Sequence, residues 1–537
     1  MAVPLRKASV LIVDDFQGIR TMLRDFVRAM GVQAIDTAGN GRDAINLLAA
    51  QRYDVVLCDY NLGHGANGQQ VLEEARARQL VGVATVWIMV TAETTPEMVA
   101  GAAEVRPDDY LLKPVNQAVL QSRLERLLAR KLSLAPVEAA VKALNYPAAI
   151  AACDAQLQAR VANPQDILRL KGELLLGMGD LDGAAALYQS ILALRAVPWA
   201  QTGLGKVVFQ QRDFSAARVR FEQVLRENGV FMEASDWLAR THSILGNTRE
   251  AERVLLEAVK VSPHSPRRQR MLGDTAYRNG SLEVAQTAFQ KGIRAGQFST
   301  HHAVTAYTGL SRVLSDQHAP NEALQTLAQG RKAFADQPEA LLLTAAAEGA
   351  VYGKLGDGNR AAQALAEAQR LQAQLEGQLK TEAQVELATS MFQMGRAQEA
   401  TELLKKVVRN HHDNPEITAG VEGLFRARGM AAEGQALIAE CCGEVVGINN
   451  QGVTLAKQGD LQGGAALLRN AALQLPNNEV VLINLCGLLI GQLQREGGNP
   501  AIVEEASAVL ERVRLLNPGN SHYHQYSAVL RRLRGAL

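Results

Sequence analysis

The sequence has few aromatic residues, few cysteines and no excess of charge of either sign. Aromatic side chains make up 4% of the 537 residues while alanine is abundant, which favours close helix packing over a large aromatic-lined pocket. The five cysteines do not repeat the paired spacing of a zinc site, so we expect them to be small buried side chains. The formal net charge of +1 argues against nucleic acid as a partner. The length favours more than one domain.

The sequence also has no apolar run of the ~20 residues that cross a membrane. Its first residues lead almost directly into a predicted strand, without the apolar core and cleavage site of a signal peptide. We therefore expect a cytoplasmic protein that does not insert into a membrane.

The first part of the chain alternates short apolar runs with amphipathic stretches. The predicted strands are Ser9–Val13, Val32–Thr37, Val55–Cys58, Ala84–Val90 and Asp109–Leu112. The predicted helices are Gln17–Met30, Gly41–Ala50, about Gly68–Arg78, one after Pro96, and a last one from Val115. Such βα units imply a parallel sheet with helices on both faces. We predict a doubly wound, five-stranded α/β domain of strand order 2-1-3-4-5.

Charged side chains follow three of these strands. Asp14 and Asp15 follow the first strand, Asp59 the third and Lys113 the fifth. Strands 1 and 3 are neighbours in the predicted order, so the three carboxylates should share one crevice, where closely spaced oxygen ligands suit Mg²⁺. Lys113 would offset the charge of a phosphoryl group, and the hydroxyl of Thr91 would donate to one of its oxygens. Asp59 is therefore the candidate phosphoryl acceptor.

As a set, these residues resemble the receiver domain of two-component response regulators, which has a flavodoxin-like fold. The resemblance implies that Asp59 is the phosphoacceptor and Asp15 a direct ligand of the metal ion. It also implies that Asp14 is a ligand through water and that the backbone carbonyl of Asn61 is a further ligand. The resemblance covers the whole first part of the chain.

The same resemblance implies roles for residues of the last two strands. Thr91 and Tyr110 correspond to the switch pair of the family and Lys113 to its invariant lysine, and the Lys113–Pro114 bond is expected to be cis. Phosphorylation would shift the face formed by the fourth helix, fifth strand and fifth helix. We expect that face to continue into the second part of the chain through Leu124, Leu127, Leu128 and Leu132.

The loop after the acceptor departs from the family pattern. Residues 61–68 are rich in glycine and slightly more numerous than usual, which should make the loop more flexible. By analogy with the family, Asn61 and Glu93 flank the path of the attacking water. We expect the departure to affect kinase selectivity and phosphate lifetime, and we expect a phosphorylated Asp59 that is not exceptionally long-lived.

Past residue 134 the strand pattern stops and a helical repeat begins. Each early unit has a turn, an alanine and a bulky residue four positions later, and these alanines recur about every 34 residues, the tetratricopeptide period. The pairs are Ala184 with Tyr188, Ala217 with Phe221, Ala251 with Leu255 and Ala285 with Phe289. One helix pair cannot bury its apolar face, so we expect an all-α solenoid. The pattern resembles tetratricopeptide proteins over nearly all of residues 135–537, with weaker later repeats.

We therefore predict a bacterial phosphorelay response regulator with a receiver domain at 1–134 and a helical repeat domain at 135–537. A sensor histidine kinase or phosphotransfer protein would phosphorylate Asp59, and the solenoid would bind a protein partner as the output. The receiver could also form homodimers. We expect a signalling protein without enzymatic activity beyond its own phosphoryl transfer and dephosphorylation.

Two alternatives remain open at this point. One is a scaffold that works without phosphorylation. The other is a transcriptional or RNA-binding regulator that uses the groove of the solenoid, although no helix-turn-helix output domain follows the receiver and the charge is nearly neutral. A steep salt dependence of nucleic-acid binding would support the second alternative.

Overall fold

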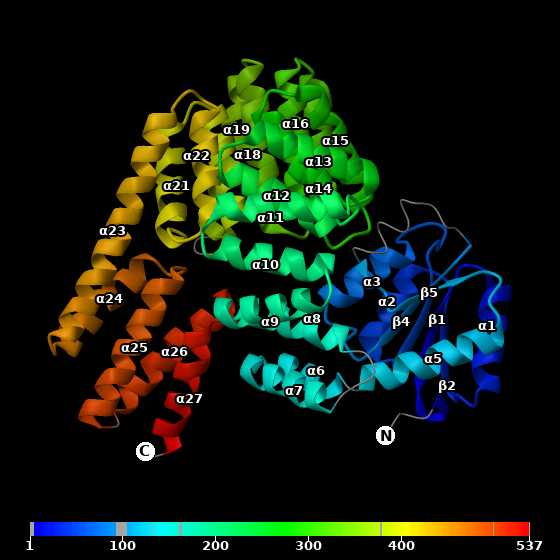
Figure 1. Cartoon of the computed structure of the whole chain (residues 1–537). Helices are drawn as coiled ribbons and strands as arrows, with labels where there is room; N and C mark the ends of the chain where they lie inside the picture. Colours follow the sequence, from blue (N-terminus) through cyan, green and yellow to red (C-terminus); the bar gives the residue numbers. More distant parts are fainter. Residues whose placement is uncertain are drawn as a thin grey trace.

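A sheet flanked by helices is followed by a long curved array of paired helices (Figure 1). The computed structural model describes residues 5–92, 105–132, 134–159, 164–375, 378–497 and 499–535. The predicted helix after Pro96 lies outside these residues.

The N-terminal part contains the predicted doubly wound sheet. Its strands are β1 (Ser9–Val13), β2 (Ala34–Ala38), β3 (Val55–Asp59), β4 (Val86–Thr91) and β5 (Asp109–Leu112). All neighbours pair in parallel in the order β2-β1-β3-β4-β5, which confirms the prediction. The helices are α1 (Gln17–Ala29), α2 (Gly41–Ala50), α3 (Gly68–Ala77) and α5 (Gln117–Leu132), and a short 3-10 helix, η1 (Leu5–Lys7), precedes β1.

Two apolar layers hold this sheet. Every residue of β3 and β4 is buried, as expected for parallel strands covered on both faces. Alternate residues of β1 point to opposite sides: Val10 and Ile12 pack with α1 and α5, whereas Leu11 and Val13 pack with α2 and α3. The unbroken apolar runs in the sequence are therefore explained by burial on two sides.

The rest of the chain is helical. Its helices are α6 (Ala135–Lys142), α7 (Tyr146–Gln158), α8 (Gln165–Gly177), α9 (Leu181–Leu194), α10 (Pro198–Gln210), α11 (Phe214–Glu227), α12 (Met232–Ile244), α13 (Thr248–Val261), α14 (Pro266–Arg278), α15 (Leu282–Gly296), α16 (Val304–Asp316), α17 (Pro320–Ala333), α18 (Pro338–Lys354), α19 (Gly358–Gln374), α20 (Thr381–Gln393), α21 (Ala397–Asn410), α22 (Pro415–Arg426), α23 (Ala431–Lys457), α24 (Leu461–Gln474), α25 (Glu479–Glu496), α26 (Pro500–Leu516) and α27 (Ser521–Gly535). Successive helices pack as antiparallel pairs and form the predicted solenoid (Figure 1).

Small residues of the repeat set the distance between paired helices. A Cβ atom placed on Gly205 would lie 2.5 Å from the ring of Phe221, and one on Gly273 would lie 2.8 Å from the ring of Phe289. Both rings are fully buried. In these two pairs the first helix thus needs a glycine where the bulky residue of the second helix packs against it, and in the α12–α13 pair the buried Ala239 takes this position.

The turns inside the pairs use left-handed backbone conformations. Gly179, Gly246 and Gly280 have φ values of +73°, +77° and +79°. In the second unit the position is taken by Arg212, whose φ is +66°. Glycine adopts this conformation without the steric cost of a Cβ atom, which explains the Gly-Asp and Gly-Asn turns in the sequence.

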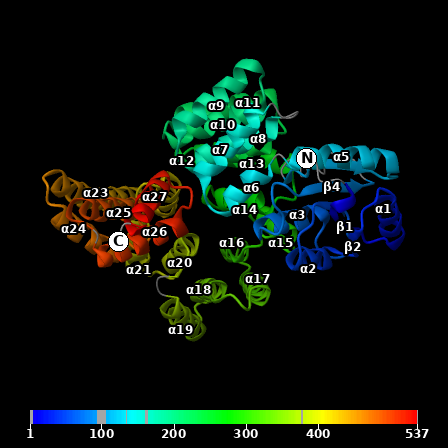
Figure 2. The same ribbon diagram turned by 90° about the horizontal axis from the view of Figure 1, so that it is seen from below.

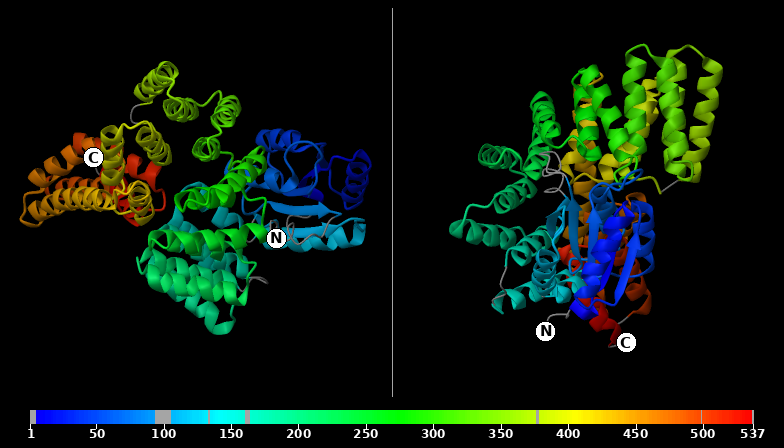
Figure 3. Two further views of the ribbon diagram at one scale, coloured as in Figure 1. Left: turned by 90° about the horizontal axis from the view of Figure 1, so that it is seen from above. Right: turned by 90° about the vertical axis from the view of Figure 1, so that its right-hand side faces the viewer.

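The solenoid curves round until its later helices meet its early ones (Figure 2; Figure 3, left). Helix α22 contacts α12, where Arg240 lies 3.8 Å from Glu416. The Arg212 guanidinium donates a hydrogen bond to the carbonyl of Asp413. A Cβ atom on Gly519, near the carboxyl end, would lie only 2.3 Å from the carbonyl oxygen of Gly177. We call this contact between early and late helices the closing seam.

Two expectations drawn from what the sequence lacks can be compared with the structure. In the part of the chain that the structure describes, no helix has the length and apolar character of a membrane span. Cys58, Cys153, Cys441 and Cys486 are buried free thiols, as predicted, and Cys442 is partly buried.

Candidate functional site

The ends of β1 and β3 bring the predicted carboxylates together. Val13 pairs with Cys58, so the residues that follow them lie side by side at one edge of the sheet. Ligand oxygens of Asp14, Asp15 and Asp59 all lie within 4.8 Å of one another. A donor set of carboxylate oxygens at this spacing suits a hard cation such as Mg²⁺.

Lys113 reaches the same place from the end of β5. Its Nζ lies 2.8 Å from Oδ2 of Asp14 and 2.7 Å from Oδ2 of Asp59. Its backbone N–H donates to the carbonyl of Thr91 (2.8 Å), and the Lys113–Pro114 bond is cis, as the resemblance implied. We call Asp14, Asp15, Asp59 and Lys113 the Asp59 crevice.

Burial and charge act in opposite directions in this crevice. The Asp59 side chain is almost fully buried, with 6% of the residue exposed, and this burial raises the pKa of its carboxyl. Pairing with Lys113 lowers that pKa and Asp14 raises it, so the net pKa of Asp59 is above its ordinary value. Burial lowers the pKa of Lys113, but its bonds to Asp14 and Asp59 outweigh burial and raise the pKa overall. Three carboxylates around one ammonium leave negative charge uncompensated.

The loop after Asp59 is tied to the crevice by its backbone. The Asn61 N–H donates to Oδ1 of Asp59 (3.4 Å), and the Gly63 N–H donates to Oδ1 of Asn61 (3.2 Å). Gly63 and Gly65 have φ values of +70° and +112°, so the glycines noted in the sequence allow turns that other residues disfavour. Glu93, the other residue expected beside the water path, lies outside the described residues.

The predicted switch residues lie on neighbouring strands. Thr91 is the last residue of β4 and is buried, with 2% of its surface exposed. Its carbonyl accepts a hydrogen bond from the backbone N–H of Lys113, which places Thr91 beside the crevice. Tyr110 is partly buried and packs on the face of the sheet that α2, α3 and Val105 cover. Burial raises the pKa of the Tyr110 phenol above its ordinary range, the nearby Tyr60 raises it further, and Arg76 on α3 lowers it.

The buried leucines of α5 do not form the apolar link between the receiver and the solenoid that the sequence predicted. Leu124, Leu127 and Leu128 are buried in the core of the receiver itself, against α1 and the strands, and the side chain of Leu132 lies outside the described residues. The three buried leucines do not form a face that continues into the solenoid, because the sheet needs them to cover one side. The contacts with the solenoid are made by α3, by Arg106, by Arg130 of α5 with Asp166 (3.0 Å), and by the segment before β4, where the Ala84 N–H donates to Glu138 (2.7 Å).

A second cluster of charges, which sequence reasoning missed, lies at this junction. The carboxylate of Glu233, in the first turn of α12, accepts from Arg106 of the receiver (2.8 Å), Arg169 of α8 (3.3 Å) and Lys206 of α10. Burial raises the pKa of Glu233, but the three cations outweigh burial and lower it overall. We call these four residues the Glu233 cluster. Its members are far apart in the sequence and follow no motif, so no local signal could have found them.

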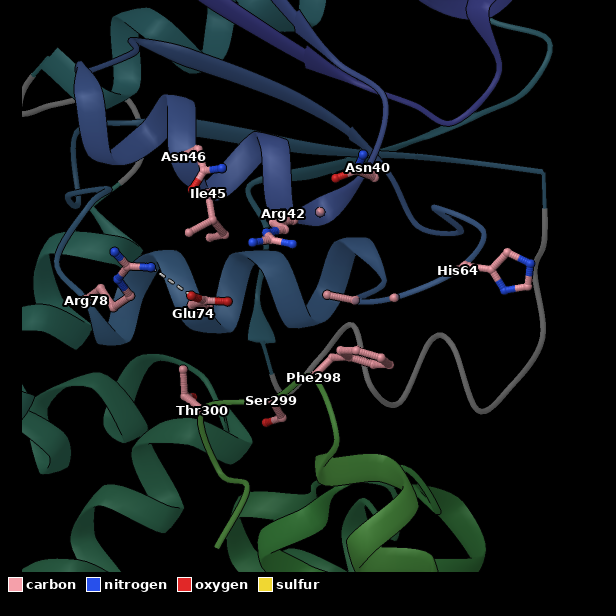
Figure 4. A pocket seen from close by; sticks show the side chains of 13 residues that line it. Asn40, Arg42, Ile45, Asn46, His64, Glu74, Arg78, Phe298, Ser299 and Thr300 are labelled. Carbon is pink, nitrogen blue, oxygen red and sulfur yellow. Dashed lines mark hydrogen bonds and ion pairs between the residues drawn. The ribbon is translucent and has the colours of Figure 1, made fainter. Parts of the chain in front are cut away.

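A cavity of about 660 Å³ separates the receiver from the solenoid beside the crevice loop (Figure 4). Ile45, Asn46 and Arg42 of α2, Glu74 of α3 and Arg78, which directly follows α3, face it from the receiver. Phe298, Ser299 and Thr300, from the connection between α15 and α16, face it from the solenoid.

The sheet order and the charged crevice define a receiver of the two-component response regulator class. A family described as "Response regulator receiver domain" matches residues 10–125, and a family described as "Tetratricopeptide repeat" matches residues 238–300.

Individual relatives match the same first part. Chemotaxis protein CheY-3 of Vibrio cholerae serotype O1 is 30% identical over 125 residues, which are 23% of this chain and 95% of that protein. Chemotaxis protein CheY of Pseudomonas aeruginosa is 30% identical over 121 residues, 22% of this chain and 96% of that protein. The crystal structure of Vibrio cholerae chemotaxis protein CheY4 at pH 4.0 is 31% identical, covers 22% of this chain and 98% of that one, and has a TM-score of 0.21. The chain belongs to the response regulator receiver family and carries tetratricopeptide repeats after the receiver.

Proposed function

We propose that this protein is a response regulator in which Asp59 accepts a phosphoryl group and the solenoid passes the signal to a protein partner. The observation that supports it most directly is the Asp59 crevice, where three carboxylates lie within 4.8 Å of one another beside the Lys113 ammonium. Such a crevice holds the nucleophile, a place for a cation and a counter-charge together. The proposal keeps the division of the chain at residue 134, a cytoplasmic location and a receiver homodimer as predictions.

In the proposed reaction an oxygen of Asp59 attacks the phosphorus of a phosphohistidine on a histidine kinase or phosphotransfer protein. The O–P bond forms as the N–P bond breaks, and the imidazole leaves with the bonding electron pair. Lys113 neutralises charge on the phosphoryl oxygens, and the Thr91 hydroxyl donates to one of them. Hydrolysis of the acyl phosphate by water restores the carboxylate.

Asp14, Asp15, Asp59 and the carbonyl of Asn61 would hold Mg²⁺ in this site. When bound, the ion would neutralise carboxylate charge and charge that develops on the phosphoryl oxygens. The residues fit such an ion, since their clustered carboxylates exceed the charge of the lysine beside them.

The test is incorporation of phosphate from acetyl phosphate and Mg²⁺ into the full chain, followed by intact mass. We expect one phosphoryl group on the wild type and none on Asp59→Ala. The matched control is Asp25→Ala, which removes an exposed carboxylate from α1 and should leave incorporation unchanged. Equal incorporation into wild type and Asp59→Ala would contradict the proposal and favour a scaffold that works without phosphorylation.

The output half of the proposal is tested separately. Affinity capture with the wild type, with and without beryllofluoride, and with Asp59→Ala should recover a protein whose binding depends on the occupancy of the crevice. Equal recovery in all three samples would contradict a phosphorylation-controlled output, even if Asp59 is phosphorylated.

A further inference from the structure

Helix α3 is joined tightly to the end of β3. A Cβ atom on Gly68 would lie 2.1 Å from the carbonyl oxygen of Asp59, and the Gly68 N–H donates to the carbonyl of Tyr60 (2.8 Å). The side chains of Asn67 and Gln70 close the first turn of the helix in a capping box. Because nothing compressible separates α3 from Asp59, a shift of the strand end must move the first turn of the helix.

The same helix touches the solenoid. The side chain of Gln70 donates to the carbonyl of Ala295 (3.0 Å), and the hydroxyl of Ser299 donates to Glu73 (3.3 Å). Ala295 lies in the last turn of α15, and Ser299 lies in the connection between α15 and α16, which Figure 4 shows facing α3 across the cavity. Residues three positions apart on α3 therefore point to one partner surface.

A second route runs from the predicted switch residue to the Glu233 cluster. Tyr110 packs on the face of the sheet that α3 covers, and the charge of Arg76 on that helix lowers the pKa of its phenol, against the larger effect of burial. The Arg76 guanidinium donates to the carbonyl of Val105 and to that of Arg106 (2.8 Å). The side chain of Arg106 then crosses to Glu233. The backbone of Arg106 is thus held by an arginine of α3, the helix that covers the same face of the sheet as Tyr110.

The junction is polar and incompletely packed. Cavities of about 660 and 440 Å³ are lined by residues of both the receiver and the solenoid. Phe298 keeps 47% of its surface exposed beside the first cavity. Interfaces of this kind between domains allow relative movement, because few apolar contacts must be broken.

We propose that phosphorylation of Asp59 weakens the docking of α3 and Arg106 on the solenoid, and that the Arg106–Glu233 ion pair is its principal polar contact. The docked arrangement accompanies the ion pair between Lys113 and Asp59. A phosphoryl group places about 1.5 to 2 negative charges where the carboxylate carried one, and its oxygens compete for this ammonium, so the strand end and the first turn of α3 readjust. The inference rests on the proposed function, since it requires that Asp59 be phosphorylated.

Hydrogen exchange of the full chain tests the inference. With Mg²⁺ and beryllofluoride, backbone amides at residues 295–303 and in the first turn of α12 should exchange about fivefold faster or more. Arg106→Glu should produce this increase without beryllofluoride, because it places a carboxylate against Glu233. The control Arg126→Glu removes a bond to Asp109 within the receiver, from a side chain that is 70% exposed, and should leave both segments unchanged.

Glu233→Gln provides a second variant, which keeps the shape of the side chain and should also raise exchange at residues 295–303. Phosphate incorporation is measured in parallel by intact mass. If Asp59 is phosphorylated but exchange stays the same or slows, the inference is overturned and the proposed function stands. If Asp59 takes up no phosphate, both are overturned. If Arg106→Glu and Glu233→Gln both leave exchange unchanged, the ion pair is not the docking contact.

Discussion

The Asp59 crevice and the Glu233 cluster each contain four charged side chains in opposite proportion. The crevice has three carboxylates around one ammonium, whereas the cluster has three cations around one carboxylate. Burial raises the pKa of both carboxyls; it prevails at Asp59, whose pKa lies above its ordinary value, whereas at Glu233 the three cations outweigh it and lower the pKa overall. The crevice retains negative charge that a cation can neutralise, and the cluster holds a carboxylate that is already compensated. The crevice therefore suits cation binding and phosphoryl transfer, whereas the cluster suits a structural contact between the receiver and the solenoid.

Glycine packing gives the largest expected difference between the two parts of the chain. Gly68→Ala should destabilise the receiver by about 3 kcal/mol, because its methyl group meets the backbone of Asp59. Gly172→Ala should cost the solenoid about 1 kcal/mol, since its methyl group meets the phenol ring of Tyr188, a side chain that can shift more easily than a backbone. Chemical denaturation, followed by tryptophan fluorescence in variants that retain only Trp87 or only Trp199, measures the stability of the receiver and of the solenoid. Equal losses of stability in the two parts would contradict the expected difference.

Glu233→Gln should have the next largest effect. It removes the carboxylate that the three cations share and leaves Arg106 and Arg169 only their longer contacts with Glu173 (3.9 and 3.5 Å), so we expect a loss of about 2 kcal/mol from the solenoid. The control is Glu222→Gln, which removes a helical pair with Arg218 and should cost about 0.5 kcal/mol or less. Denaturation followed at Trp237 checks both variants, and equal losses would contradict the special role of the cluster.

The same kind of substitution should act in the opposite direction in the crevice. Asp59→Asn removes one of three crowded carboxylates and should stabilise the receiver by about 1 kcal/mol. Denaturation at pH 7 without divalent cations, followed at Trp87, measures the change. A clear loss of stability would mean that Lys113 fully compensates the carboxylates.

Lowering the pH should distinguish the stability effect of Asp59→Asn from that of Glu233→Gln. The pKa of Asp59 is raised in the folded protein, so its ionisation costs the folded state; the gain from Asp59→Asn should be complete near pH 7 and shrink as the pH falls through the raised value. The pKa of Glu233 is lowered, so its contribution is present above its ordinary value of 4.5 and lost only as the pH falls below that value. Denaturation of both variants from pH 7 downwards should therefore show the effect of Asp59→Asn shrinking while the pH is still above 3.8, and the effect of Glu233→Gln shrinking only below pH 4.5.

Binding of Mg²⁺ should have the smallest effect. At twice its dissociation constant, the ion should stabilise the wild-type receiver by about 0.6 kcal/mol, and Asp15→Asn should lose this gain. Thermal unfolding with and without Mg²⁺ measures the shift, with Asp25→Asn as the control. An equal gain in Asp15→Asn would place the ion elsewhere.

The elements and the crevice could be predicted because their causes are local or periodic. Strand ends deliver Asp14, Asp59 and Lys113 to one edge once the strand order is given, and apolar runs with a 34-residue repeat specify the rest. The junction could not be predicted, because Arg106 and Glu233 meet only after the solenoid has curved. The face assigned to Leu124, Leu127 and Leu128 failed for a related reason: an apolar helix face does not reveal which of two cores it covers.

The closing seam limits how the repeat region can change in length. Gly519 lies against Gly177, and Arg212 binds the backbone of Asp413, so the first and last repeats meet at a fixed register. An inserted repeat of about 34 residues would advance every later helix along the superhelix and separate these partners. The contacts of the closing seam therefore limit the number of repeats that this solenoid can contain.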